Sequence, residues 1–160
     1  MAARRNTKIK VAHVLDHVGL GGIQTQLYRV LSHLDRDRFE VHLHTPRGAR
    51  AMKDDFEALD LTFYHYSKSF FGLPWIMAEF ARHVREEEYD IMHYHMAASR
   101  VFGYLSLRSK PDSTHIVVHH HSHLFRLPTY YGIVPKFDSM ADMLLACSSA
   151  VADEVRSAYD

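Results

Sequence analysis

The sequence of 160 residues contains one cysteine, Cys147, and no apolar run long enough to cross a membrane. A single cysteine cannot form an internal disulfide, and so few cysteines fit a reducing compartment. The basic residues at the start lead into an apolar stretch at 9–15, far short of the roughly 20 residues that a membrane span needs. No secretory signal is recognisable there either. We therefore expect a cytoplasmic protein.

An excess of one charge is also missing, because lysine plus arginine and aspartate plus glutamate both number 19. Proteins that bind nucleic acid usually carry a basic excess or a basic stripe, so this balance argues against a nucleic-acid partner. Histidine is abundant instead: the chain has 14, which would make it cationic below about pH 6. The share of hydrophobic residues, 47%, is that of a globular protein, and a chain of this length buries roughly 70% of its unfolded surface.

Apolar, β-branched runs alternate with stretches of helical periodicity along the whole chain. Strands are predicted at 9–15, 39–44, 61–66, 90–95, 115–119 and 143–147, the last of them as a buried strand. Helices are predicted at 23–34, around Phe56, at 75–87, around Phe102, around Phe137 and from Ser148 or Ser149 onward. This alternation predicts an α/β fold, a Rossmann-like parallel sheet with helices on both faces. Residues 1–160 are expected to form a single domain.

Histidines gather at or just beyond the predicted strand ends. In a parallel α/β sheet, ligands bind at the carboxyl ends of the strands. The histidines at these ends are His17, His44, His93, His95, His119, His120, His121 and His123. This distribution is the main reason to expect a functional site there.

A glycine-rich segment, Gly19-Leu-Gly-Gly22, joins the first predicted strand to the first helix. Glycines let the backbone approach a ligand closely, and a helix start offers unpaired N–H groups to a phosphate. A dinucleotide site would need a third glycine where Gln24 stands and an acidic residue where the second strand ends in His44 and Thr45. NAD binding is therefore disfavoured, which leaves a phosphate-binding loop or a simple tight turn.

Several segments, taken in order, resemble the N-terminal half of GT4-type glycosyltransferases, which have the GT-B fold. The opening of the family is resembled by three segments, 8–15, Gly21-Gly-Ile-Gln24 and 34–41. In the family, the glycine motif reads Gly-Gly-x-Glu. The segment 89–95 resembles the family's Asp-Val-Val-His-x-His, 119–123 its histidine-rich strand end, and 143–148 its Ile-Ile-Ala-Val-Ser. The resemblance covers about residues 8–158.

This resemblance implies an acceptor-binding domain of a retaining transferase that uses a nucleotide-diphosphate sugar and holds no tightly bound cofactor. Gly21 and Gly22 would face the donor diphosphate. The catalytic position near the donor sugar falls on His119, His120 or His121, where the register is ambiguous. Histidine there would orient groups and stabilise charge. The acceptor-binding positions that the resemblance implies are His17, Gln24, His93, His95, Ser99, Arg100 and His123.

The family's C-terminal, donor-binding domain is not found before the chain stops at Asp160. We therefore expect an excised domain or one half of a split enzyme, inactive alone. The acceptor stays open between a glycan, a lipid-linked acceptor and a small molecule. Two alternatives also stay open: a non-catalytic subunit that binds a sugar or lipid acceptor, and a fragment of a GT-B-like sugar-nucleotide epimerase.

A zinc site is a further alternative for His119, His120, His121 and His123. Alternating histidines on one strand face can share a metal ion, but no clear acidic ligand lies nearby. We expect no physiological metal site, and only adventitious binding of nickel or zinc.

The most apolar loop carries Phe70, Phe71 and Trp75. These side chains could contact the inner face of a membrane peripherally. Packing beneath the following helix or against the missing domain is the favoured alternative. Cys147 is expected to be a small, buried core residue.

Overall fold

The computed structural model describes residues 8–46, 51–66, 72–106, 110–122 and 132–159. These ranges contain the strands β1 Ile9–Val14, β2 Phe39–Thr45, β3 Thr62–His65, β4 Ile91–Tyr94, β5 His115–His120 and β6 Met143–Ala146. The helices are α1 Gly22–Ser32, α2 Lys53–Glu57, α3 Leu73–Glu87, α4 Ala97–Ser106, α5 Ile133–Asp138 and α6 Ser149–Tyr159. Every predicted strand and helix is present, with bounds that differ by a few residues.

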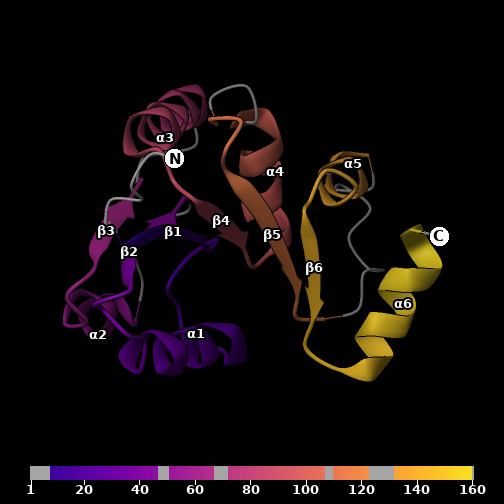
Figure 1. Cartoon of the computed structure of the whole chain (residues 1–160), viewed down its shortest axis with the longest axis horizontal. Helices are drawn as coiled ribbons and strands as arrows, with labels where there is room; N and C mark the ends of the chain where they lie inside the picture. Colours follow the sequence, from indigo (N-terminus) through magenta and orange to yellow (C-terminus); the bar gives the residue numbers. More distant parts are fainter. Residues whose placement is uncertain (1–7, 47–50, 67–71, 107–109, 123–131, 160) are drawn as a thin grey trace, which may run out of the picture.

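All six strands run parallel, in the order β3-β2-β1-β4-β5-β6 (Figure 1). The chain starts in the middle of the sheet, moves outward to β3, and returns through α3 to the other side of β1. The direction of winding therefore reverses between β1 and β4, which is where sheets of this kind bind ligands. The structure confirms the predicted Rossmann-like fold.

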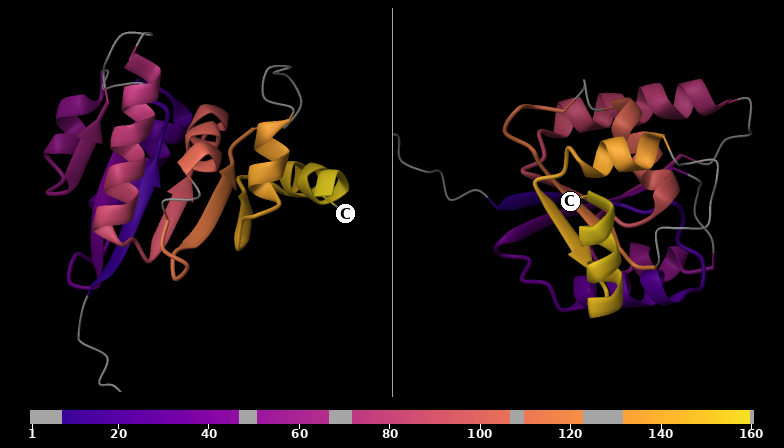
Figure 2. Two further views of the ribbon diagram at one scale, coloured as in Figure 1. Left: turned by 90° about the horizontal axis from the view of Figure 1, so that it is seen from above. Right: turned by 90° about the vertical axis from the view of Figure 1, so that its right-hand side faces the viewer.

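Helices cover both faces of the sheet, with α1 and α2 on one side and α3, α4 and α5 on the other (Figures 1 and 2). Leu27 and Leu31 of α1 share a core with Leu43 of β2 and Phe56 of α2. Leu27 and Leu31 both face the sheet because residues four apart lie on one side of a helix.

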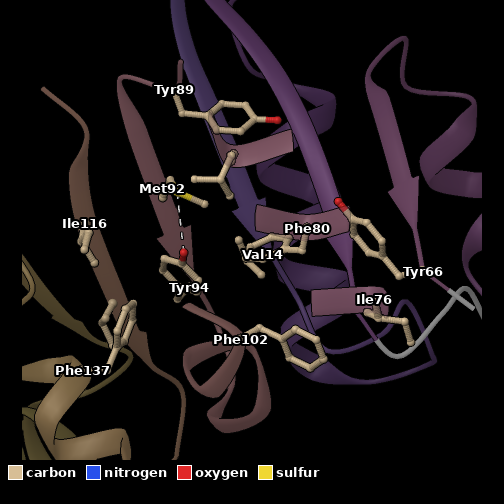
Figure 3. Close-up of a cluster of buried hydrophobic side chains, with 13 residues drawn as sticks. Val14, Tyr66, Ile76, Phe80, Tyr89, Met92, Tyr94, Phe102, Ile116 and Phe137 are labelled. Carbon is tan, nitrogen blue, oxygen red and sulfur yellow. Dashed lines mark hydrogen bonds between the residues drawn. The ribbon is translucent and has the colours of Figure 1, made fainter. Parts of the chain in front are cut away.

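The core beneath α3, α4 and α5 is richer in aromatic rings (Figure 3). Phe80 of α3 meets Phe102 of α4 edge to face, with ring centroids 6.3 Å apart. Tyr94 of β4 and Phe137 of α5 meet in the same way at 4.8 Å. A Cβ placed on Gly103 would lie 2.6 Å from Phe137 and 2.7 Å from Tyr94. The glycine therefore lets α4 approach these two rings.

Imidazole and phenol groups form a continuous hydrogen-bonded chain beneath α3. The hydroxyl of Tyr89 lies 2.8 Å from Nδ1 of His42 and 2.8 Å from Nε2 of His44. The hydroxyl of Tyr66 lies 2.8 Å from Nδ1 of His44 and 2.8 Å from Nδ1 of His83. Burial, with smaller contributions from His42 and His83, holds the pKa of His44 well below its usual value. His44 is therefore a buried, hydrogen-bonded residue of the core under α3, although it stands near the end of a strand.

One of the two edge strands of the described sheet, β6, is half-exposed. Met143 is 54% exposed, and Cys147, just beyond the strand, is an exposed free thiol. The predictions of a buried sixth strand and a buried Cys147 are therefore wrong. An edge strand has a neighbour on one side only, and an apolar run cannot reveal which strand lies at the edge.

Candidate functional site

The glycine segment after β1 leads directly into α1, whose start is exposed. Gly21 is the N-cap residue, and in the described structure no side chain caps this helix and no acidic residue lies in its first turn. The first N–H groups therefore keep the partial positive charge of a helix N-terminus. A Cβ placed on Gly22 would meet no described heavy atom within 4 Å. This end of α1 can receive a phosphate.

Gln24 folds back beneath the glycine segment and is buried. Its Nε2 donates a hydrogen bond to the carbonyl oxygen of His17 at 3.3 Å. Its Oε1 lies 2.6 Å from the position that a Cβ on Gly21 would take, so a side chain at position 21 would displace it. Nδ1 of the half-buried His17 accepts a hydrogen bond from the N–H of Gly19 at 3.0 Å. Both predicted acceptor residues therefore help to hold the loop in shape.

Five histidines gather on one face of the sheet, toward the carboxyl ends of β1, β4 and β5. We call them the imidazole cluster: His13, His93, His95, His119 and His121. His13 is paired in register with His93 of β4, and on its other side with Leu43 of β2. Since side chains alternate along a strand, His93 and His95 share this face, as do His119 and His121. The same face of the sheet is covered by α1 and α2 where they pack on β2 (Figure 1).

The rings of the cluster touch one another. Nδ1 of His13 lies 2.9 Å from Nε2 of His95, and Nδ1 of His95 lies 3.2 Å from Nε2 of His121. Ring centroids are 4.1 Å apart for His93 and His95, and 3.8 Å apart for His119 and His121. Nε2 of His93 is buried and has no hydrogen-bond partner among the described residues. His13 and His95 are buried while the other three are half-buried, so the cluster runs from the core toward the surface.

Burial keeps these imidazoles uncharged. Desolvation lowers the pKa of His13 to about 4. Desolvation, and then the neighbouring His119, lower the pKa of His121 to about 4. The pKa of His95 lies well below its usual value, first through burial and then through His93. At neutral pH each ring therefore offers one N–H donor and one lone pair, which suits a sugar hydroxyl or a metal ion.

His120 points to the opposite face, where it joins a buried ion pair. Oδ2 of Asp138 lies 3.0 Å from Nη1 of Arg100 and 3.3 Å from Nε2 of His120. The hydroxyl of Tyr159 donates a hydrogen bond to the same oxygen at 2.7 Å. These contacts tie α4, α5, α6 and β5 together. The structure thus separates two predicted site residues, His120 and Arg100, from the imidazole cluster.

Ser99 is buried in the first turn of α4. Its hydroxyl donates to the carbonyl oxygen of Met96 at 2.6 Å and accepts from the N–H of Met96 at 3.1 Å. Its own N–H donates to the carboxylate of Asp16, which follows β1. Ser99 therefore fixes the start of α4 at the switch point between β1 and β4.

Three further predicted residues, His123, Phe70 and Phe71, lie outside the described residues. Trp75 stands in the first turn of α3 and is 65% exposed. In the described ranges, every helix is too short or too polar to span a membrane.

His13 belongs to the cluster but was missed by the sequence analysis, because it lies inside an apolar strand. Alternation along β1 indicates that it points to the same side as Val11 and Leu15. Only the pairing of β1 with β4 shows that His93 and His95 lie on that side too.

A family model described as Glycosyltransferase Family 4 matches residues 20–160. The match takes in the start of α1 and four members of the imidazole cluster, those on or just after β4 and β5. The chain belongs to glycosyltransferase family 4. The resemblance found in the sequence is thereby confirmed.

Solved glycosyltransferase structures share the fold of this family 4 chain. Anabaena HepE, in complex with UDP and glucose, gives a TM-score of 0.74 at 18% identity over 94% of this chain. The lipopolysaccharide outer core galactosyltransferase WaaB, in its apo form, gives 0.64 at 17% identity over 92% of this chain. The O-GlcNAc transferase of Thermobaculum terrenum gives 0.53 at 17% identity over 78% of this chain and 26% of its own. A comparison with curated protein sequences gave no significant match.

The chain covers 41% of HepE and 42% of WaaB, about two fifths of their length. These identities are low, so the likeness establishes the fold: the Rossmann-like half of a GT-B glycosyltransferase.

Proposed function

We propose that this family 4 chain is the N-terminal, acceptor-side domain of a retaining glycosyltransferase that takes sugar from a nucleotide-diphosphate donor. The observation that carries the proposal is that the exposed start of α1 and the imidazole cluster lie at the same carboxyl edge of the sheet. A phosphate-binding helix end and neutral hydrogen-bonding rings suit the two parts of a nucleotide sugar. The presence of UDP and glucose in the HepE structure supports the same donor class.

On the donor side, Gly21 and Gly22 face the diphosphate, where exposed N–H groups of α1 stabilise its charge. His119 and His121 are half-buried and point to the face shared with His95. They orient the sugar by hydrogen bonds and stabilise charge at the reacting centre. His120 is not part of this proposal, because it contacts Asp138 on the other face.

On the acceptor side, the loops are held in shape by His17, Gln24 and Ser99. The buried part of the acceptor site is lined by the stacked rings of His93 and His95. The acceptor is a glycan, a lipid-linked acceptor or a small molecule. The chain acts in the cytoplasm, and the exposed indole of Trp75 supports peripheral contact with the inner face of a membrane.

A second domain that binds the donor completes the site. A two-walled cleft is needed to hold donor and acceptor in reacting geometry, and that positioning supplies much of the rate. Residues 1–160 alone are therefore expected to transfer no sugar efficiently. Rapid turnover by the isolated chain would contradict this part of the proposal.

The test joins the chain to a family 4 donor-binding domain and measures transfer from a panel of radiolabelled nucleotide-diphosphate sugars. NMR of the product then shows whether the anomeric configuration is retained. Gly22→Ala is the informative variant, since a Cβ there meets no described atom but would enter the space given to the phosphate. It should lower kcat/KM by more than about tenfold at unchanged stability. Gly132→Ala, whose Cβ also meets no described atom, is the matched control.

Three outcomes would contradict the proposal in different ways. Failure to transfer sugar from any donor would sink it. Conversion of the nucleotide sugar to an epimer without an acceptor would favour the epimerase alternative. Acceptor binding without turnover in the joined protein would favour a non-catalytic subunit.

A further inference from the structure

The imidazole cluster contains two groups of three histidines. Within each group, one nitrogen from each ring lies within 4.8 Å of the other two. One group is His13, His93 and His95, and the other is His95, His119 and His121. The second group is the more accessible, because two of its three rings, His119 and His121, are half-buried, whereas His93 is the one half-buried ring of the first group. An ion could reach this second group from solvent.

The spacing within the second group already suits a shared ion. Nδ1 of His95 lies 3.2 Å from Nε2 of His121. Two nitrogens bound at about 2.0 Å to a tetrahedral ion stand about 3.3 Å apart. The third ring, His119, lies against His121 with centroids 3.8 Å apart. The rings therefore need only small adjustments to coordinate one ion.

We propose that His95, His119 and His121 form a binding site for one divalent transition-metal ion of the zinc class, with the fourth position open to solvent. The inference rests on the geometry of the cluster and holds whether or not the chain takes part in sugar transfer. The sequence predicted only adventitious binding, at His119, His120, His121 and His123. The site proposed here differs in its ligands: it omits His120 and His123 and adds His95 from the end of another strand.

The chemistry of the three ligands selects the class of ion. Transition metals bind the neutral imidazole, and burial lowers the pKa of His95, His119 and His121. A set of three imidazoles suits zinc, cobalt, nickel or copper, whereas magnesium and calcium require oxygen ligands.

His13 supplies the partner that a metal-binding histidine usually has. A ligating imidazole almost always donates its other ring N–H to a fixed acceptor. When His95 binds through Nδ1, its Nε2–H donates to Nδ1 of His13, 2.9 Å away. His93 stacks on His95 at 4.1 Å and limits rotation of the ring. The ring of His95 is therefore held in the orientation that coordination needs.

A third group of possible ligands, Glu40, His42 and Glu87, lies under α3 and already holds a cation. Nζ of Lys10 lies 2.7 Å from Glu87 and 3.2 Å from Glu40. An ammonium group thus already neutralises the two carboxylates of this group. We assign the metal to the histidine group alone.

The experiment titrates the untagged chain with Zn²⁺ by calorimetry and with Co²⁺ by visible absorbance. We expect one ion per chain, the intense visible bands of four-coordinate Co²⁺, and loss of these bands when Zn²⁺ is added. His119→Gln and His121→Gln should each lower the affinity by more than about tenfold, since even an outer partner contributes that much. His65→Gln and His115→Gln, at exposed histidines outside the cluster, should leave it unchanged.

Ring ¹⁵N chemical shifts of the wild-type chain provide a measurement that does not depend on variants. Zn²⁺ should move the signals of His95, His119 and His121 and leave that of His65 in place. Absence of the Co²⁺ bands, or affinity unchanged in both cluster variants, would mean adventitious surface binding and overturn the proposal. Unmoved ring signals at one equivalent of Zn²⁺ would overturn it as well.

Discussion

His13 and His95 are 82 positions apart in the sequence, yet Nδ1 of His13 lies 2.9 Å from Nε2 of His95. They meet because β1 and β4 are neighbours at the point where the winding of the sheet reverses. The contact joins the most buried end of the imidazole cluster to the rings that approach the surface.

Replacing His13 with leucine should weaken both the fold and the proposed metal site. The change leaves Nε2 of His95 buried without an acceptor, at a cost of about 1–3 kcal/mol in the free energy of unfolding. It should also raise the Kd for Zn²⁺ by about tenfold, as loss of an outer partner does. Urea denaturation and Zn²⁺ calorimetry measure the two effects, with exposed His65→Leu as control. Unchanged values in both would show that the contact is energetically neutral.

Acid should destabilise the protein through His44. The pKa of this histidine is depressed by burial and by His42 and His83, so it stays neutral when the unfolded chain, near pKa 6.5, takes up a proton. Its contribution to stability is therefore present above about pH 6.5 and is lost as the pH falls. Its two ring nitrogens face the hydroxyls of Tyr66 and Tyr89, and the rings of Tyr64 and His83 also pack against it.

Urea denaturation between about pH 7 and about pH 5 measures this dependence. The unfolding free energy of His44→Asn should fall less steeply than that of the wild type, by up to about 1.4 kcal/mol per pH unit. His65→Asn, at an exposed position on β3, should keep the wild-type slope. Equal slopes for His44→Asn and the wild type would contradict the prediction.

The ion pair between Arg100 and Asp138 should be critical for stability. Both side chains are buried, so Asp138→Asn leaves the guanidinium uncompensated. The expected loss is about 3–5 kcal/mol of unfolding free energy. Asp153→Asn removes a similar charge from the exposed pair with Arg156 and should cost less than about 1 kcal/mol. Similar losses in the two variants, measured by urea denaturation, would refute the argument.

Gly103→Ala should destabilise the protein although it favours the helix. Alanine gains about 1 kcal/mol of helix propensity over glycine. The new methyl would, however, lie within 2.9 Å of three ring atoms of Tyr94 and Phe137, and overpacking of a core costs about 1–3 kcal/mol. Since both rings are buried and cannot retreat, we expect a net loss in thermal denaturation. A raised Tm would show that α4 shifts freely.

Restoring the family's acidic residue at position 24 should weaken the glycine segment. In Gln24→Glu, a carboxylate oxygen would replace Nε2 next to the carbonyl oxygen of His17. The hydrogen bond would be lost, and two acceptor oxygens would repel each other. The expected cost is about 1–3 kcal/mol. Gln26→Glu makes the same change at an exposed site of α1 and should be nearly neutral. Equal denaturation midpoints for the two variants would argue against a structural role of Gln24.

The site could be predicted from the sequence only in part. The strand-end histidines His93, His95, His119 and His121 were identified, because parallel strands end at one edge of the sheet. Alternation places His120 opposite His119 and His121, but the sequence did not show which of these two faces meets the histidines of β1 and β4. The resemblance placed Arg100 among the acceptor-binding residues, and the sequence did not show that Asp138, 38 positions later, lies against it.

By itself, the sequence determined the order of strands and helices, the glycine segment and the family, because periodicity and turn residues are local signals. The tertiary structure alone decided which histidines meet. Strand pairing placed His13 beside His95, and alternation sent His120 to the face opposite its neighbours. Burial, which depends on the packing of the whole sheet and its helices, then keeps the clustered imidazoles neutral.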